Sequence, residues 1–192
     1  MAADPIARFR RWFDQAARAG ISLPEAMALG TADRRRRPSV RFVLLKQVDQ
    51  RGFVFFTDGR SRKGGELRAN PRASVAFYWN ALGRQVRVEG RIEPVTAAEA
   101  DAYWVTRPRS SRLAALASQQ SAPLASRRWL QTRWKILRRT HRGQDLPRPP
   151  QWTGYRITPE TIEFWTHRQH RLHNRELFVR TRRGWKRRLL QP

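Results

Sequence analysis

The pattern of apolar and polar residues at the start of the chain is helical. Residues 5–19 carry apolar side chains three or four residues apart, with arginines between them, at Ile6, Phe9, Trp12, Phe13 and Ala16. This spacing predicts an amphipathic helix over residues 5–19. A basic amphipathic helix can lie on a membrane surface, but we favour a helix that covers the protein's own core.

The next block has the two-residue alternation of β-strands, as in Gln85–Val88. Asp49–Gly52 is typical of a hairpin turn, because glycine supplies a positive φ angle. Ser61 is suited to cap a helix over residues 61–70, which ends before Pro71. We expect strands at residues 26–31, 39–48, 53–57, 72–80 and 85–95, with a second hairpin turn at 81–83.

Helices are predicted after this block. Thr96 and Glu99 form a capping-box pattern that begins a helix reaching about Thr106. Two further helices are expected at residues 110–118 and 126–141. A proline-rich loop follows at residues 144–151. The last expected strands are residues 154–157, 161–167, 177–181 and 185–190.

The order of these elements is helix, β meander, helices and then strands, without the βαβ alternation of a doubly wound sheet. The pattern predicts a mainly β protein with flanking helices (α+β), built on a small antiparallel barrel. We expect one domain over residues 1–192. It comprises an N-terminal helix (5–19), barrel strands (26–95 and 153–190) and a helical insert (96–142).

Composition narrows the classes of protein that fit. Cysteine is absent, which excludes disulfides and thiolate chemistry. No apolar stretch is long enough to span a membrane, and no secretory signal precedes the first helix. We therefore expect a cytoplasmic protein without a membrane partner.

The charge is the unusual property of this sequence. The net charge is +25, and lysine occurs only at positions 46, 63, 135 and 186, so 36 of the 40 basic residues are arginine. Such a surplus can attract nucleic acid, can cover a solvated surface, or can supply phosphate ligands inside a pocket. No nucleic-acid-binding motif accompanies it, so we do not expect nucleic acid as the partner.

Standard catalytic and metal-binding motifs are missing. The sequence has no glycine-rich dinucleotide motif, no P-loop, and no set of residues that marks a hydrolase triad. His167, His170 and His173 lie three residues apart, but in a strand that runs into a turn this spacing does not converge on a metal. We expect no metal site.

Polar clusters lie where an antiparallel barrel would display them. Each cluster alone is more often structural than functional, but together they offer two groups of donors suited to two phosphates. The clusters are Arg41 with Lys46; Ser61, Arg62 and Lys63; Arg84 with Gln85; Tyr103, Arg107 and Ser111; Gln120 with Ser121; and Arg171, His173 and Arg175.

These clusters, in this order and spacing, resemble the pyridoxine/pyridoxamine phosphate oxidase family over nearly the whole chain. The motifs that carry the resemblance are Arg41–Lys46, Phe55–Thr57, Ser61–Lys63, Arg84–Val86, Tyr103–Ser111, Gln120–Ser121, Ile162–Trp165 and Arg171–Arg175. The resemblance implies an FMN-binding split β-barrel and a homodimer with FMN between the subunits. It also implies oxidation of pyridoxine 5′-phosphate or pyridoxamine 5′-phosphate to pyridoxal 5′-phosphate, with hydride transfer to the flavin and reoxidation by oxygen to give hydrogen peroxide.

The resemblance also assigns roles to residues. Arg171 and His173 would flank the substrate ring and act as the catalytic residues. The substrate would be bound by Lys46, Tyr103, Arg107, Ser111, Arg171 and His173. The cofactor would be bound by Arg41, Phe42, Val43, Leu44, Leu45, Lys46, Phe56, Thr57, Arg62, Lys63, Gln85, Gln120, Ser121, Trp165 and Arg175.

Three positions depart from the family pattern. Asn174 stands where aspartate is usual, Phe56 stands where tyrosine is common, and only three residues precede Asp4, where relatives carry a segment that folds over the substrate. Two alternatives therefore stay open. One is a related flavin oxidase of another ring substrate, of the phenazine-precursor type. The other is a flavin- or polyanion-binding module without turnover.

Overall fold

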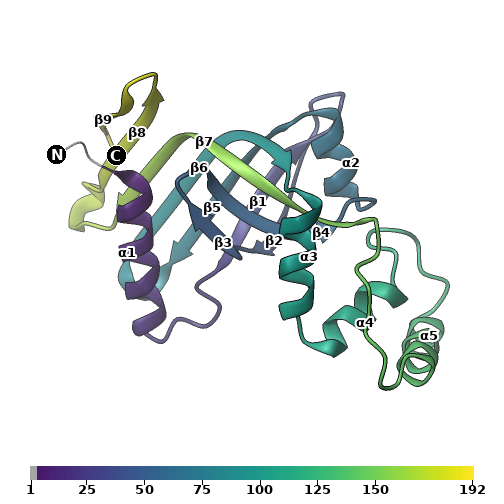
Figure 1. The fold of residues 1–192 in the computed structure, drawn as a ribbon. Coiled ribbons are helices and arrows are strands. Elements are labelled where there is room, and N and C mark those ends of the chain that lie inside the picture. The colour runs from purple at the N-terminus through teal and green to yellow at the C-terminus, as the bar shows by residue number, and fades with distance from the viewer. Residues whose placement is uncertain (1–3) are drawn as a thin grey trace.

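The computed structural model describes residues 4–192, and its strands form one curled, fully antiparallel sheet flanked by helices (Figure 1). The strand order is β2-β1-β5-β6-β7-β4-β3, with β8 pairing β7 and β9 pairing β8. The strands are β1 (Ala26–Ala32), β2 (Pro38–Leu44), β3 (Gln47–Asp49), β4 (Gly52–Asp58), β5 (Arg72–Trp79), β6 (Arg84–Pro94), β7 (Trp152–Thr166), β8 (Asn174–Thr181) and β9 (Gly184–Leu190). The predicted fold class is confirmed.

The helices agree closely with the sequence pattern. The predicted caps are present at Ser61, which accepts a hydrogen bond from the Gly64 backbone, and at Thr96, whose capping box with Glu99 is complete. The helices are α1 (Pro5–Arg18), α2 (Arg62–Ala69), α3 (Ala97–Thr106), α4 (Arg109–Ala117) and α5 (Arg127–Thr140).

Helix α1 covers the core, as the sequence predicts. Asp4 begins it by accepting hydrogen bonds from the backbone N–H groups of Ile6 and Ala7. Ile6 and Phe9 are fully buried, and the Phe9 ring lies 4.8 Å from that of Phe53 in an edge-to-face arrangement. The apolar face of α1 therefore packs on the sheet.

One predicted strand is two in the structure. Residues 39–48 were expected to be continuous, but β2 ends at Leu44 and β3 begins at Gln47. Leu45 turns into the core, where its backbone N–H donates to Glu25, and the N–H of Lys46 donates to Val54. The apolar run hid this break because its residues look alike on either side. The hairpin turn before Gly52, which has a φ of 140°, is confirmed.

Conversely, the strands predicted at residues 154–157 and 161–167 are one strand, β7. Residues 158–160 were not predicted as strand, but Pro159 pairs with Gly90 of β6 and Glu160 is the extra residue of a bulge in β7. A Cβ on Gly90 would overlap the carbonyl oxygen of Thr158, so the bulge depends on glycine. Strand β7 runs beside β6 for most of its length, and pairs with β4 near its start and with β8 near its end.

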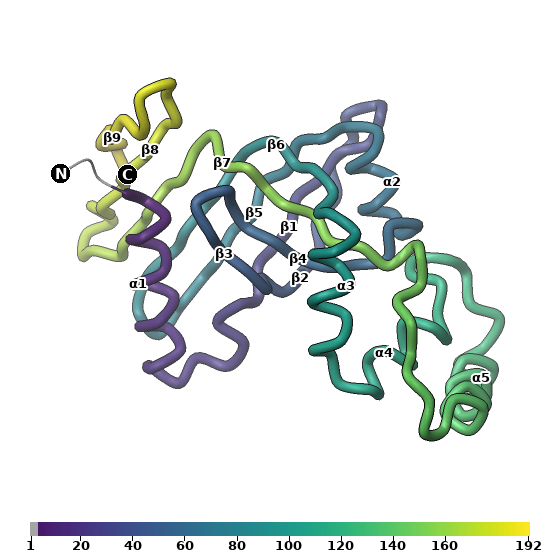
Figure 2. Tube along the Cα trace, in the orientation of Figure 1, coloured from purple at the N-terminus to yellow at the C-terminus, as the bar shows by residue number. Residues whose placement is uncertain are grey.

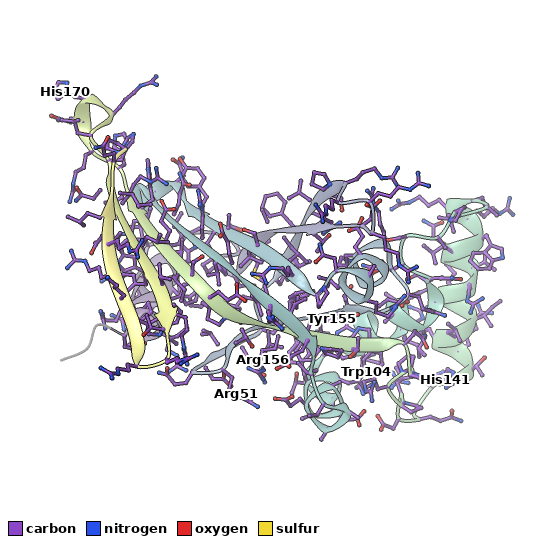
Figure 3. All side chains as sticks on the ribbon, turned by 90° about the horizontal axis from the view of Figure 1, so that it is seen from above. Arg51, Trp104, His141, Tyr155, Arg156 and His170 are labelled. Atoms are coloured by element: carbon purple, nitrogen blue, oxygen red, sulfur yellow. The ribbon has the colours of Figure 1, made fainter. Side chains whose placement is uncertain are left out.

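The helical insert and the last strands lie at opposite ends of β7. Figure 3 shows His170, in the turn after β7, at one tip, with Trp104 and His141 of the insert toward the other. The end of the chain returns to the beginning of α1, as the trace in Figure 2 shows, and Arg8 pairs there with Glu176 at 2.6 Å.

A charge network around the buried Arg156 fixes the beginning of α3 to the sheet. Arg156 of β7 pairs with Asp49 at 2.9 Å and with Glu99 at 2.8 Å, and Arg51 pairs with both carboxylates from the outside (Figure 3). The capping-box carboxylate of α3 is thereby tied to two strands, which sets the position of the residues that α3 carries further along.

Candidate functional site

The largest concentration of predicted site residues lines one cavity of about 610 Å³. Its wall comes from β2, β4, the beginning of α2, the end of α3 and the loop after α4. The residues that line it are Ser39, Val40, Arg41, Phe42, Val43, Leu44, Lys46, Phe56, Thr57, Arg62, Lys63, Tyr103, Arg107, Gln120, Ser121 and Trp152.

Two arginines pair with one carboxylate at the β2–α2 side of this cavity, and a lysine lies nearby. Glu66 accepts from Arg41 at 3.0 Å and from Arg62 at 2.8 Å, and also from the hydroxyls of Thr31 and Ser39. Burial acts to raise the pKa of Glu66, but these hydrogen bonds lower it to about 2. Glu66 is therefore ionised and orients both arginines.

Lys63 is the third cation, and it is buried. Its Nζ donates to Gln120 Oε1 at 2.9 Å, to Thr57 Oγ1 at 3.1 Å and to Ser61 Oγ at 3.4 Å. Burial, followed by the nearby charge of Arg41, lowers the pKa of Lys63. A lysine held among neutral oxygens beside another cation would be stabilised in its charged form by an anion. We call Arg41, Arg62, Lys63 and Glu66 the cavity cluster.

An aromatic stack forms another part of the cavity wall. The ring of Phe56 lies 4.1 Å from that of Tyr103 and 5.2 Å from that of Trp152, and the three rings are close to parallel. Burial raises the pKa of Tyr103, so its hydroxyl stays protonated and can donate. No hydrogen bond within residues 4–192 uses that hydroxyl.

Arg107 lies at the break between α3 and α4. Its guanidinium carbon is 4.8 Å from the ring centre of Trp152, and its Nη1 is buried without a hydrogen-bond partner in the described chain. Burial lowers the pKa of Arg107, and a buried guanidinium nitrogen without an acceptor is costly. Arg107 also lines the cavity, where its guanidinium can meet an anionic ligand. Ser111 lines an adjoining hollow of about 310 Å³ that also contains Arg107.

The five remaining predicted residues lie at the far end of the sheet. Gln85, Trp165 and Arg175 are directly paired across β6, β7 and β8. Arg175 donates to Glu163 at 2.7 Å. We call Gln85, Trp165, Arg171, His173 and Arg175 the distal cluster.

The turn after β7 holds His173 against this row. The rings of Trp165 and His173 are 4.5 Å apart. His173 Nδ1 accepts from the backbone N–H of Arg168 at 3.2 Å, so neutral His173 carries its proton on Nε2. His170 and Arg171 have positive φ angles of 56° and 61°, a conformation that L residues rarely adopt.

The predicted residues therefore fall into two groups. The expected cofactor and substrate residues from the first two thirds of the chain line the cavity, with three exceptions. Gln85 belongs to the distal cluster, Leu45 is buried in the core, and Ser111 lines the adjoining hollow. No residue of the distal cluster lines the cavity within one chain.

Sequence reasoning missed two residues at the cavity. Trp152 completes the aromatic stack but follows a proline-rich loop without a periodic pattern. Glu66 organises the cations, and its signal was available, because it is the one acidic residue among the basic residues of 60–72 and lies four residues after Arg62.

Exposed apolar side chains accompany both groups. Val40 and Phe42 of β2 are 72% and 77% exposed beside the cavity, and Leu172 and Leu189 are exposed beside the distal cluster. Exposed apolar patches of this kind favour contact with another protein surface.

Two other classes of site find no support in the described chain. Residues 4–192 contain no cluster of three or more histidine, aspartate or glutamate side chains placed to hold a metal ion. None of the helices in this range is long and apolar enough to cross a membrane.

Two protein-family models together match residues 13–192 of the sequence. Residues 13–166 match the family described as pyridoxamine 5′-phosphate oxidase. Residues 152–192 match the pyridoxine 5′-phosphate oxidase C-terminal dimerisation region. The second match covers β7, β8, β9 and most of the distal cluster.

Individual relatives extend over nearly the whole chain. A pyridoxine/pyridoxamine 5′-phosphate oxidase from Rubrobacter xylanophilus is 53% identical over 189 residues, which are 98% of this chain and 87% of the relative. One from Sphingopyxis alaskensis is 50% identical over 192 residues, covering 100% and 89%. The crystal structure of PhzG from Burkholderia lata in complex with tetrahydrophenazine-1-carboxylic acid has a TM-score of 0.94 at 36% identity, covering 98% and 93%.

Proposed function

Because this chain belongs to the pyridoxamine 5′-phosphate oxidase family, we propose that it oxidises pyridoxine 5′-phosphate or pyridoxamine 5′-phosphate to pyridoxal 5′-phosphate with FMN as its cofactor. The observation that carries this proposal is the orphan Nη1 of Arg107, in a cavity that has a second, separate group of cations. One cavity with two anion subsites suits a phosphorylated cofactor and a phosphorylated substrate.

The cavity cluster fits the FMN phosphate. Arg41, Arg62 and Lys63 outnumber their one carboxylate, so the cluster keeps a surplus of positive charge for a dianion. Ser121, in the cavity wall with a φ of 70°, would add a hydroxyl. The residues that would border the rest of the flavin are 42–46, Phe56, Thr57 and Gln120.

The α3–α4 side fits the substrate phosphate. Tyr103, Arg107 and Lys46 all line the cavity, and their side chains make no hydrogen bond within residues 4–192. Ser111 would donate from the adjoining hollow. Four donors on one phosphate, at roughly 1.5–3 kcal/mol each, are enough to anchor a small ring compound.

The site would be completed by a second copy of the chain. The distal cluster lies at the other end of β7, in the segment that matches a dimerisation region. In a twofold dimer, each distal cluster would meet the cavity of the other copy. Gln85, Trp165 and Arg175 would then border the flavin, and Arg171 and His173 would flank the substrate ring.

The residues of the chain bind and orient the reactants. The redox chemistry would be that of bound FMN, a two-electron (hydride) oxidation of the exocyclic carbon of the substrate, with oxygen as the final acceptor and hydrogen peroxide as its product. Tyr103 and Arg107 would fix the substrate phosphate, and this remote anchor holds the exocyclic carbon in place. His173, with its proton on Nε2, can donate to the substrate ring or its hydroxyl.

An anaerobic absorbance titration tests this function. The protein is purified with FMN, and pyridoxine 5′-phosphate and pyridoxamine 5′-phosphate are added in turn while the oxidised flavin band is followed. We expect the band to bleach and to return when air is admitted, with formation of pyridoxal 5′-phosphate. FMN binding without bleaching by either compound would reject the substrate assignment, and failure to bind FMN would reject the cofactor.

A second candidate is oxidation of a non-phosphorylated ring related to tetrahydrophenazine-1-carboxylic acid. The TM-score of 0.94 with the complex of PhzG favours it. The unpartnered donors Tyr103 and Arg107 favour the phosphorylated substrate instead. Repeating the titration with tetrahydrophenazine-1-carboxylic acid separates the two candidate functions, because only the true substrate of this protein should bleach the flavin quickly.

A further inference from the structure

Helix α5 lies at the surface of the fold and packs on α4. It lies at the outer edge of the helical insert, beyond α4 (Figure 1), and none of its fourteen residues is buried. The side of α5 that faces α4 is not fully packed against it. Leu130 and Trp134 of α5 line an open groove of about 510 Å³ together with Ala114 and Ala117 of α4. The rest of the helix is exposed.

The charge of α5 is wholly positive. Six of its residues are arginine or lysine and none is acidic. The surrounding stretch, residues 102–144, contains ten basic residues and no acidic one. Within residues 4–192, no ion pair or side-chain hydrogen bond uses the cations of α5, and only Arg133 and Arg138 find a local partner, by stacking on Trp129 and Trp134.

The exposed surface of α5 is also amphipathic. Trp129 and Ile136 lie seven residues apart, hence on one face, and are 48% and 57% exposed. Leu124, just before the helix, is 49% exposed and lines the same hollow as Trp129. Helical geometry places Arg133 on one side of the exposed line formed by Trp129 and Ile136. The other side carries Arg128, Lys135 and Arg139.

We propose that α5 is a docking surface for an anionic lipid bilayer, on which Trp129, Ile136 and Leu124 enter the headgroup region while Arg128, Arg133, Lys135 and Arg139 contact lipid phosphates. A short helix with a cationic polar face, low overall hydrophobicity and an exposed tryptophan is the kind that lies in a membrane interface. The cytoplasmic leaflet carries the anionic lipids that such cations attract. This surface differs from a spanning segment, which the sequence excludes.

Two other partners fit less well. Duplex nucleic acid would engage the cations, but its phosphate exterior offers no apolar layer to receive Trp129 and Ile136. A second copy of this chain, with its own charge of +25, would be repelled by α5. Under the proposed function a second copy meets the cavity, which no residue of α5 lines.

Vesicle co-sedimentation at about 150 mM salt tests the proposal. The FMN-loaded full chain is mixed with vesicles of phosphatidylcholine alone or with phosphatidylglycerol, and we expect binding only to the anionic vesicles. The triple substitution Arg128→Gln, Lys135→Gln and Arg139→Gln should weaken binding about a hundredfold, at roughly fivefold for each cation. The double substitution Trp129→Ser and Ile136→Ser should weaken it at least about tenfold.

A matched control separates this surface from bulk charge. The triple substitution Arg34→Gln, Arg35→Gln and Arg36→Gln removes the same three charges from the exposed loop between β1 and β2, and should change binding less than about threefold. An equal loss in this control would overturn the assignment to α5. Absence of binding to anionic vesicles would also overturn it.

The apolar pair distinguishes lipid from nucleic acid. If Trp129→Ser with Ile136→Ser leaves vesicle binding unchanged while the α5 charge variant abolishes a duplex DNA gel shift, the surface binds phosphate polyanions and the lipid proposal fails. The flavin absorbance and melting temperature of each variant report that it is folded. None of the substituted residues lines the cavity, so failure here leaves the proposed oxidase function untouched.

Discussion

The guanidinium of Arg107 stacks 4.8 Å above the ring of Trp152 while its Nη1 stays buried without an acceptor in the described chain. The stacking fixes the plane of the guanidinium, so the unused N–H points in one direction. A preformed, desolvated donor of this kind contributes more to anion binding than an arginine on the surface.

Arg107→Met should therefore lower the catalytic efficiency of the protein with a phosphorylated substrate. We expect kcat/KM for pyridoxamine 5′-phosphate to fall about 10- to 100-fold, which corresponds to one charge-assisted hydrogen bond of roughly 1.5–3 kcal/mol. Steady-state kinetics measure it, and activity on unphosphorylated pyridoxamine is the control that should not change. An equal loss on both compounds would mean that Arg107 does not bind the phosphate.

The fold could be predicted from the sequence wherever a local pattern carried the information. The capping box at Thr96, the cap at Ser61 and the hairpin at Gly52 are decided by neighbours in the chain, and all three are confirmed. The break between β2 and β3 was missed because it depends on Glu25 and Val54, which accept from the backbone N–H groups of Leu45 and Lys46 and lie outside the apolar run. The continuity of β7 was missed because Gly90 of another strand accommodates Pro159.

The two amphipathic helices α1 and α5 show that a sequence pattern does not decide whether the apolar face of a helix is buried. Both α1 and α5 alternate arginines with aromatic residues, yet Phe9 is fully buried and Trp129 is half exposed. Their patterns alone cannot distinguish them, because burial depends on where the rest of the chain leaves an uncovered sheet. The roles of the site residues, likewise, rested on family resemblance, and they remain predictions.

Glu66 should make stability depend on pH in the acid range. Its pKa is about 2 in the folded protein against an ordinary value of 4.5, so its ionised form stabilises the fold above pH 4.5 and this contribution is lost as the pH falls toward 2. We expect Glu66→Gln to lower the free energy of unfolding by about 3 kcal/mol at pH 7.

Chemical denaturation at several pH values measures this effect. The difference between wild type and Glu66→Gln should shrink between pH 4.5 and pH 2. Asp145→Asn, which removes an exposed carboxylate paired only with Arg112, is the control and should show little difference at any pH. A difference for Glu66→Gln that does not change with pH would contradict the assigned cause.

Mixing two inactive variants should restore activity if the site is shared between chains. Lys63→Met removes a cation of the cavity cluster and Arg175→Met removes one of the distal cluster. A heterodimer of the two has one site with both defects and one intact site. Random mixing gives half heterodimers, so about a quarter of native activity should return.

The control for this experiment is a mixture of Lys63→Met with Arg41→Met. Both lie in the cavity cluster, so every site of the mixed dimer keeps a defect and activity should stay low. The subunits are dissociated in mild denaturant and reassembled before the assay. No recovery in the test mixture would argue for a site within one chain, and recovery in the control would mean that restored activity does not report a shared site.

The two adjacent glycines of α2 should respond oppositely to alanine. A Cβ on Gly64 would overlap the carbonyl oxygen of Gly59, whereas on Gly65 its nearest neighbour is Arg68 Nη2 at 3.9 Å. Gly64→Ala should destabilise the protein by about 1–3 kcal/mol through overpacking. Gly65→Ala should stabilise it by up to about 1 kcal/mol through helix propensity. Thermal unfolding of the FMN-free protein measures both, and similar melting temperatures would contradict the packing at Gly59.

Strand β7 carries Trp152 of the cavity at its first residue and Trp165 of the distal cluster near its end, about 43 Å away along the strand. In evolutionary terms, the proposed shared site would constrain a single stretch of the gene by two active sites. One inserted residue would reverse the facing of every side chain beyond it and displace the distal cluster of both copies. Changes in length should be tolerated in the loop of residues 141–151 and selected against within β7, although no residue in the middle of that strand lines the cavity.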